Sequence, residues 1–218
     1  MRLRADARPF LRKTLATLSA LAGDATGAKA AAIVNRIHAR WHADKGYTCV
    51  TLSASDGHRA CRVTLPGDGA PANVSTTFHL ACDDSPARKV ECEEIRFDIE
   101  QGKVWIAAGN LAWPLEPPNS ADAQTYPSQE LTDLFTSANA LRDTAASRVE
   151  LNPNYLADGL AIFTGFWDKL PDTLVAKNKP RFDFITGGKH DPILLVTELP
   201  TTAPPFRIEY LLMPYCTP

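Results

Sequence analysis

The sequence predicts an α+β protein in which a helix followed by antiparallel strands occurs twice. An amphipathic helix is predicted over residues 9–22 and a second one over 152–165. Each helix precedes runs in which polar and apolar residues alternate, and short turns separate these runs, as expected for antiparallel strands. Because the two units match, both helices should pack side by side on one face of the sheets.

Composition and charge narrow the possible functions. The chain has 218 residues, of which 44% are apolar and 22% are charged, which favours one domain or two small ones. The net charge of −2 provides no overall basic field for nucleic acid or membranes. The five cysteines show no C-x-x-C spacing, so we expect reduced thiols in a cytoplasmic protein without structural zinc.

The first helix is predicted from leucine spacing. Pro9 suits a first helical turn. The Arg-rich start is also compatible with a targeting peptide, but hydroxyl side chains interrupt its apolar run, so a helix is the better interpretation. The predicted buried stripe of this helix, at i, i+4, i+7 and i+11, comprises Leu11, Leu15, Leu18 and Ala22.

Alternating runs and turn residues predict the strands of the first unit. The Asp56-Gly57 pair predicts a tight turn between two of them, with the glycine at positive φ. A loop is predicted over 66–75, irregular structure over the proline-rich segment 113–129, and a short helix or an ordered connection over 130–143. The expected strands span 30–43, 47–55, 60–65, 93–100 and 103–109.

The second unit begins with clear helix signals. Asn152 is a plausible N-cap and Pro153 suits the first helical position. Leu156, Leu160 and Phe163 should form the buried stripe of this helix. Three strands are predicted after it, over 181–186, 191–198 and 206–214.

Four fragments, in order along the chain, resemble bacterial DNA polymerase III β subunits, the sliding clamps. "SDGHRACRV" (55–63) resembles the T-D-G-H-R segment of the clamp middle domain, with Ser55 in place of the threonine. The other fragments are "AIVNRIHARW" (32–41), "LNPNYLADGL" (151–160) and "EYLLMPYCTP" (209–218). This resemblance implies a DNA-clamp-like α+β fold, with repeated helix-plus-antiparallel-strand units and the helices on one face of the sheets.

The resemblance also implies a domain division. Residues 1–128 are similar to the clamp middle domain, and 129–218 are similar to the C-terminal half of a clamp. An alternative is one clamp domain that carries an insertion at about 70–145. The chain is shorter than a three-domain clamp subunit, so ring formation does not follow from the resemblance.

In clamps, the T-D-G-H-R turn and the C-terminal strand wall a hydrophobic pocket for short peptides of polymerases and repair proteins. The resemblance implies a similar pocket here, in which His58 and Arg59 can hold a peptide carbonyl or carboxylate at the rim. Apolar anchors of the peptide would enter the floor, where Met213 is adaptable. The implied pocket residues are Val34, Ser55, Gly57, His58, Arg59, Ala60, Tyr155, Leu211, Leu212, Met213, Pro214 and Tyr215.

DNA contact is a weaker implication. Clamp helices face the duplex and touch phosphates, without base readout. Arg8, Arg12 and Lys13 of the first helix are candidates, whereas 152–167 contains no Lys or Arg. A solvated polar face explains the same residues equally well. A clamp of this length would have to assemble from several copies, so the resemblance implies a homo-oligomer.

The resulting hypothesis is a non-enzymatic, clamp-like protein of replication or repair without a cofactor. The alternative is a relic of the clamp fold that acts as an assembly or regulatory module. A metal-dependent enzyme is a further alternative, with His38 and His42 joined by Asp44 or Asp56. A nucleophile pair of Cys61 and His58 is another enzyme alternative, although no orienting carboxylate or oxyanion motif accompanies it.

Overall fold

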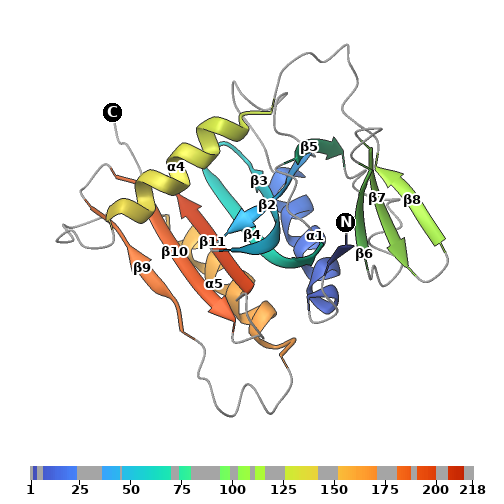
Figure 1. Ribbon diagram of the computed structural model, residues 1–218. Coiled ribbons are helices and arrows are strands. Elements are labelled where there is room, and N and C mark those ends of the chain that lie inside the picture. The colour runs from blue at the N-terminus through green and yellow to red at the C-terminus, as the bar shows by residue number, and fades with distance from the viewer. Residues whose placement is uncertain are drawn as a thin grey trace.

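Figure 1 shows the computed structural model, in which two helices and a third lie on opposite sides of a broad antiparallel sheet. The structure describes residues 2–3, 7–23, 36–44, 46–69, 74–79, 94–98, 103–108, 111–115, 126–141, 152–170, 181–187, 191–199 and 206–213. None of the helices in these ranges is long and apolar enough to cross a membrane.

The helices and strands alternate much as the sequence indicates. The helices are α1 (Arg8–Gly23), α4 (Ser128–Ala140) and α5 (Pro153–Trp167). The strands of the first half are β1 (Arg2–Leu3), β2 (Arg36–Asp44), β3 (Tyr47–Ser55), β4 (Arg59–Asp68), β5 (Val74–His79), β6 (Glu94–Asp98), β7 (Lys103–Ala108) and β8 (Leu111–Leu115). Those of the second half are β9 (Asp183–Ile185), β10 (Ile193–Leu199) and β11 (Phe206–Leu212).

One sheet joins the two halves of the chain. Its strand order is β5-β2-β3-β4-β11-β10-β9, and β1 pairs with β4 outside this path. The junction is the antiparallel pair β4–β11, in which Ala60 lies opposite Leu211 and Thr64 opposite Arg207. A second, three-stranded sheet has the order β6-β7-β8. The sheet is therefore continuous across the boundary between the two predicted units.

The two predicted helices share one face of the large sheet, as expected. The leucine stripe of α1 is fully buried there, at 0–1% exposure. Phe163, Phe166 and Trp167 of α5 belong to the same core cluster, together with Trp41 of β2. Burial of this apolar surface is the main favourable contribution to packing both helices on the sheet. The prediction that these helices pack beside each other is confirmed.

The start of α5 is confirmed, but its buried stripe differs from the prediction. The Asn152 side chain accepts a hydrogen bond from the Asn154 amide at 3.0 Å, and proline follows the cap. Gly159 is buried, whereas Leu156 and Leu160 are only half-buried. A methyl group at Gly159 would lie 2.6 Å from the Tyr210 ring, so the helix approaches the sheet through its glycine.

Strands β4, β5 and β8 and the position of one helix differ from the sequence-based expectation. β4 continues through Pro66 to Asp68, and β5 starts within the predicted loop and pairs with β2. β8 contains Pro114 but lies at the edge of its sheet, where a missing amide donor is tolerated. Helix α4 lies on the face of the sheet opposite α1 and α5, so the helices are not all on one face.

Candidate functional site

The turn between β3 and β4 is held by its own side chains. Gly57 has a φ of +96°, which glycine adopts without strain. The Asp56 carboxylate accepts hydrogen bonds from the backbone amides of His58 and Arg59 at 2.9 and 2.8 Å. The Ser55 hydroxyl donates to the Arg59 carbonyl and accepts from the Gly57 amide. The polar side chains of Ser55 and Asp56 therefore fix the backbone of this turn, while Gly57 and His58 remain exposed.

The end of β11 lies directly beside this turn. Leu212 is opposite Arg59 in the β4–β11 ladder, and the Met213 amide donates to the His58 carbonyl at 3.0 Å. Met213 is 41% exposed, which is unusual for a large apolar side chain next to a buried strand. The structure thus brings together two segments that lie about 150 residues apart in sequence, as the pocket hypothesis requires.

Helix α4 supplies a third wall that the sequence reading did not include. Pro127, Leu131 and Leu134 from the start of the helix face the turn and the end of β11. Together these segments enclose a cavity of about 240 Å³. Among the described residues, its lining consists of Ser55, Gly57, His58, Arg59, Ala60, Pro127, Glu130, Leu131, Leu134, Leu211 and Met213. The cavity has an apolar floor and a polar rim, the usual composition of a ligand site.

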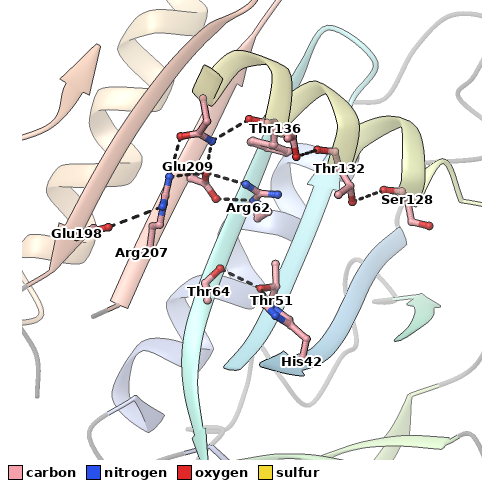
Figure 2. A network of polar contacts seen from close by, with 12 residues as sticks. His42, Thr51, Arg62, Thr64, Ser128, Thr132, Thr136, Glu198, Arg207 and Glu209 are labelled. Atoms are coloured by element: carbon pink, nitrogen blue, oxygen red, sulfur yellow. Dashed lines mark hydrogen bonds and ion pairs between the residues drawn. The ribbon is translucent and has the colours of Figure 1, made fainter. Parts of the chain in front are cut away.

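A buried charge network fixes α4 to the sheet (Figure 2). Glu209 is 2% exposed and accepts two hydrogen bonds from Arg62, at 2.6 and 2.8 Å. Glu209 also accepts hydrogen bonds from Arg207 of β11, at 3.1 Å, and from Asn139 of α4, at 3.0 Å. The Arg62 guanidinium carbon lies 4.3 Å from the centre of the Phe135 ring. The wall formed by α4 therefore depends on these charges as well as on apolar packing.

The network also controls the ionisation of Glu209. Burial alone would raise the pKa of this carboxyl group, but the hydrogen bonds and charge of Arg62, with Arg207 and Asn139, outweigh burial. The net effect lowers the pKa of Glu209, which keeps it charged at neutral pH.

Arg59 is paired within the chain. Its guanidinium binds Asp56 at 2.6 Å, forms an ion pair with Asp158 of α5, and lies 4.7 Å from the centre of the Tyr155 ring. Burial would lower the pKa of Arg59, but Asp56 and its other partners raise it overall. Two carboxylates therefore already neutralise the charge of Arg59 in this arrangement, and its role in holding a peptide carbonyl or carboxylate stays a prediction.

The remaining predicted pocket residues occupy other places. Tyr155 lies on the helix side of Arg59 and packs against the core, outside the cavity. Leu212 is 1% exposed and points into the same core, because neighbouring residues of a strand face opposite sides. Val34, Pro214 and Tyr215 lie outside the described residues.

The candidate DNA residues all lie on α1, but their surroundings differ. Arg8 donates to the Leu3 carbonyl at 3.4 Å, and Arg12 is exposed. Lys13 is half-buried and lies against α5, where a methyl group at Gly165 would be 2.8 Å from its ammonium nitrogen. Their proposed role in DNA contact stays a prediction.

The residues named in the two enzyme alternatives make contacts that do not assemble a catalytic site. The His42 ring bonds to the Thr51 hydroxyl at 2.8 Å, and the His38 ring stacks on Tyr126 at 5.6 Å. Burial lowers the pKa of His38 to about 4. Within the described ranges, no three His, Cys, Asp or Glu side chains are grouped as metal ligands would be.

The proposed Cys61–His58 pair does not form. The Cys61 thiol is fully buried on the helix face, and burial raises its pKa. His58 is exposed at the tip of the turn. A buried neutral thiol and a solvent-exposed imidazole on this strand do not make a nucleophile and base.

Comparison with known proteins finds matches among solved structures alone: no protein-family model and no curated protein matches the sequence. The fold is similar to that of the C. crescentus β sliding clamp, with a TM-score of 0.57 and 14% identity over 99% of this chain and 66% of that chain. The H. pylori β clamp gives a TM-score of 0.55 at 12% identity, again over 99% and 66% of the two chains.

A third match is the DNA polymerase III β chain of Streptococcus pneumoniae, with a TM-score of 0.52 and 14% identity over 100% of this chain and 64% of that chain. This chain thus spans about two thirds of the length of these clamps. Nearly all of the chain is included in each of the three matches. The protein therefore has the fold of the bacterial β sliding clamps.

Proposed function

We propose that the protein is a non-enzymatic, clamp-like docking module that binds short peptides of replication or repair proteins in the cavity between the β3–β4 turn, α4 and the end of β11. The observation that carries this proposal is the cavity itself, in which two segments distant in sequence share one apolar floor. Exposed Met213 at its rim supplies an adaptable apolar contact for a partner side chain.

The charges around the cavity suggest how a peptide would be held. Because Arg59 is already paired, polar contacts would come from His58 and from backbone groups of the exposed turn. Leucine or phenylalanine anchors would enter between Leu131, Leu134 and Leu211. Burial of the apolar surface of one or two anchors contributes about 2–5 kcal/mol to the free energy of binding. Ordering the peptide offsets part of this gain, so micromolar affinity is expected.

Met213→Ala should weaken binding of a peptide rich in Gln, Leu and Phe by about 1–2 kcal/mol, which is roughly a 5- to 30-fold rise in Kd. Fluorescence polarisation of a labelled peptide measures this change. Tyr47→Ala is the matched control, because Tyr47 is 44% exposed but does not line the cavity. If the wild-type protein does not bind at hundreds of micromolar, the proposal fails for this peptide class.

We further propose that the protein assembles with copies of itself through the edge of the large sheet. Among the described strands, β9 ends the sheet; Phe184 within it is 47% exposed, and Phe182 directly before it is 44% exposed. An unpaired strand edge flanked by exposed aromatic side chains favours pairing with another chain.

Light scattering at tens of micromolar should therefore show a dimer or a larger closed assembly. Phe184→Lys should shift the protein toward the monomer, since a charge on an edge strand opposes pairing. Tyr47→Lys, at an exposed position far from this edge in the strand order, should leave the assembly unchanged. A wild-type protein that is monomeric at this concentration contradicts the assembly proposal and favours a clamp-fold module that does not form a ring.

A further inference from the structure

The cavity at the β3–β4 turn has an uneven charge distribution, which bears on the kind of peptide that it can take. Two of its described lining residues, Arg59 and Glu130, carry a side chain that is normally charged. They come from opposite walls and differ in accessibility. The Arg59 side chain is 10% exposed, whereas Glu130 is fully open to solvent.

The Arg59 side chain is directed away from the wall that α4 forms. Arg59 and Ala60 are neighbours on β4, so their side chains face opposite sides of the sheet. Ala60 packs in the core cluster beneath α4. Arg59 contacts Tyr155 and Asp158 of α5, which lies on the other side of the sheet (Figure 1). Since Asp56 binds it as well, this group of three charges is negative overall.

The backbone of the turn uses its own amide groups. The Asp56 amide donates to the Arg59 carbonyl at 3.2 Å, and the Gly57 amide donates to the Ser55 hydroxyl at 3.1 Å. The next two amides donate to the Asp56 carboxylate. The Met213 amide, at the end of β11, donates to a carbonyl of the turn. Among these described groups, an acidic ligand therefore finds no amide that is not already engaged.

The first turn of α4 is a further source of positive potential at the cavity. A helix N-terminus favours anions, and Pro127 at the N-cap provides no capping side chain. However, Glu130 lies in this first turn, so its carboxylate already supplies the negative charge that the helix dipole favours. The amides of Ser128 and Leu131 donate to carbonyls of the preceding segment.

The accessible charge on the α4 side of the cavity is therefore acidic. Arg62 and Arg207 lie on the same face of the sheet, but Glu209 binds both and neither lines the cavity. A carboxylate can accept several hydrogen bonds at once. Glu130 can therefore bind a cation of a partner in addition to its contacts within the chain.

We propose that this cavity selects peptides whose apolar anchors are flanked by a lysine or an arginine, and that Glu130 determines this preference. The specificity rests on the peptide docking proposed above. Anchors would enter between Leu131 and Leu211 while the neighbouring cation donates to the Glu130 carboxylate. A charge contact at an exposed rim adds little affinity, but it discriminates between partners because like charges repel.

Three peptides with identical Leu and Phe anchors and capped termini test this preference. They carry Lys, Gln or Glu at the position directly before the anchors, and a second series carries the same residues directly after them. In one of the series, fluorescence polarisation at low salt should show the Lys peptide binding about three- to fivefold more tightly than the Gln peptide, and the Glu peptide more weakly by a similar factor. About 0.5 M NaCl should bring the three Kd values within roughly twofold, because salt screens exposed charges.

Glu130→Gln should make the Lys and Gln peptides bind equally, while the Kd of the Gln peptide stays within about twofold of the wild-type value. Asp133→Asn is the matched control, because Asp133 is an exposed carboxylate of the same helix that does not line the cavity. This variant should keep the preference for lysine. Glu130→Lys should reverse it in favour of the Glu peptide, which a merely structural role of Glu130 would not produce. Circular dichroism checks that each variant is folded.

The outcomes separate the specificity from the docking itself. Binding of the Gln peptide without a preference for lysine in either series, or a preference that survives Glu130→Gln, overturns the specificity and leaves the docking proposal standing. Tighter binding of the Glu peptide by the wild type also overturns it, and would assign the contact to Arg59 or to the first turn of α4. If none of the peptides binds at hundreds of micromolar, the proposed function fails and the specificity fails with it.

Discussion

Replacing Glu209 by alanine should lower the free energy of unfolding by about 3 kcal/mol. Glu209 is buried under α4 and accepts hydrogen bonds from Arg62, Arg207 and Asn139. Without Glu209, Arg62 and Arg207 lose their shared counter-charge and lie beside a cavity. Their side chains are only 20% and 25% exposed, so water can replace the carboxylate only in part. Urea denaturation followed by circular dichroism measures the loss.

Two matched variants test the cause. Glu198→Ala removes a carboxylate that is 49% exposed and 3.9 Å from Arg207, so it should change stability by less than about 0.5 kcal/mol. Glu209→Gln keeps most of the shape and should lie between the alanine variant and the wild type. Hydrogen exchange of α4 should increase in Glu209→Ala, because Asn139 loses one of its anchors. Equal effects of Glu198→Ala and Glu209→Ala would contradict the network as the cause.

The dependence on pH has a defined sign. Because the pKa of Glu209 is lowered in the folded protein, its contribution is fully present above the unfolded pKa of about 4.3 and is lost as pH falls through the folded pKa. The wild type should therefore lose more stability than Glu209→Gln as the pH falls below about 4.3. Parallel stability curves of the two proteins across this window would show that the carboxylate is not specifically stabilised.

Asp56→Ala should destabilise the protein by about 2–3 kcal/mol and also weaken peptide binding. Asp56 is 3% exposed, and its carboxylate organises the turn through the amides of His58 and Arg59 and the Arg59 side chain. Without it, two amides and a guanidinium lose an acceptor, and the wall beside Met213 is no longer fixed. Denaturation and peptide titration of the same variant measure the two effects.

Asp56→Asn is the informative comparison. The amide oxygen of asparagine can still accept from the two backbone amides, whereas the charge opposite Arg59 is lost. We therefore expect roughly half the destabilisation of Asp56→Ala and near-normal peptide binding. An alanine variant within about 0.5 kcal/mol of the wild type would show that the turn is held mainly by Ser55 and the strands.

Local patterns predicted the elements that contact the main core. The leucine spacing of α1 and the Asn152-Pro153 start of α5 are strong signals, because helical period and capping are local properties. The Asp-Gly turn was equally clear, since its positive φ depends on one residue. The division into 1–128 and 129–218 stays a prediction.

The missed elements depend on tertiary context. β5 is specified by its pairing with β2, and β8 tolerates Pro114 only because it lies at an edge. The buried stripe of α5 was misplaced because Gly159 gains its burial from the Tyr210 ring of a distant strand. Propensity alone does not include such contacts.

The candidate site was only partly predictable for the same reason. Ser55, Gly57, His58, Arg59, Ala60, Leu211 and Met213 do line one cavity, while their role in peptide binding stays a prediction. The α4 wall was missed, although Leu131, Phe135 and Ala138 recur at helical spacing, a signal that identifies its buried face. The pairing of Arg59 with Asp158 joins residues 99 positions apart, which no local pattern reveals.

The β4–β11 seam has a consequence for how the chain reaches its native state. Arg62 and Glu209 meet across the middle of the sheet although they lie 147 positions apart. Until β11 has been synthesised and docked, β4 presents an open edge flanked by apolar surface. Such non-local topology slows folding and prolongs the time during which intermediates can associate wrongly. We therefore expect chaperone dependence and aggregation during refolding to respond most strongly to changes in β11.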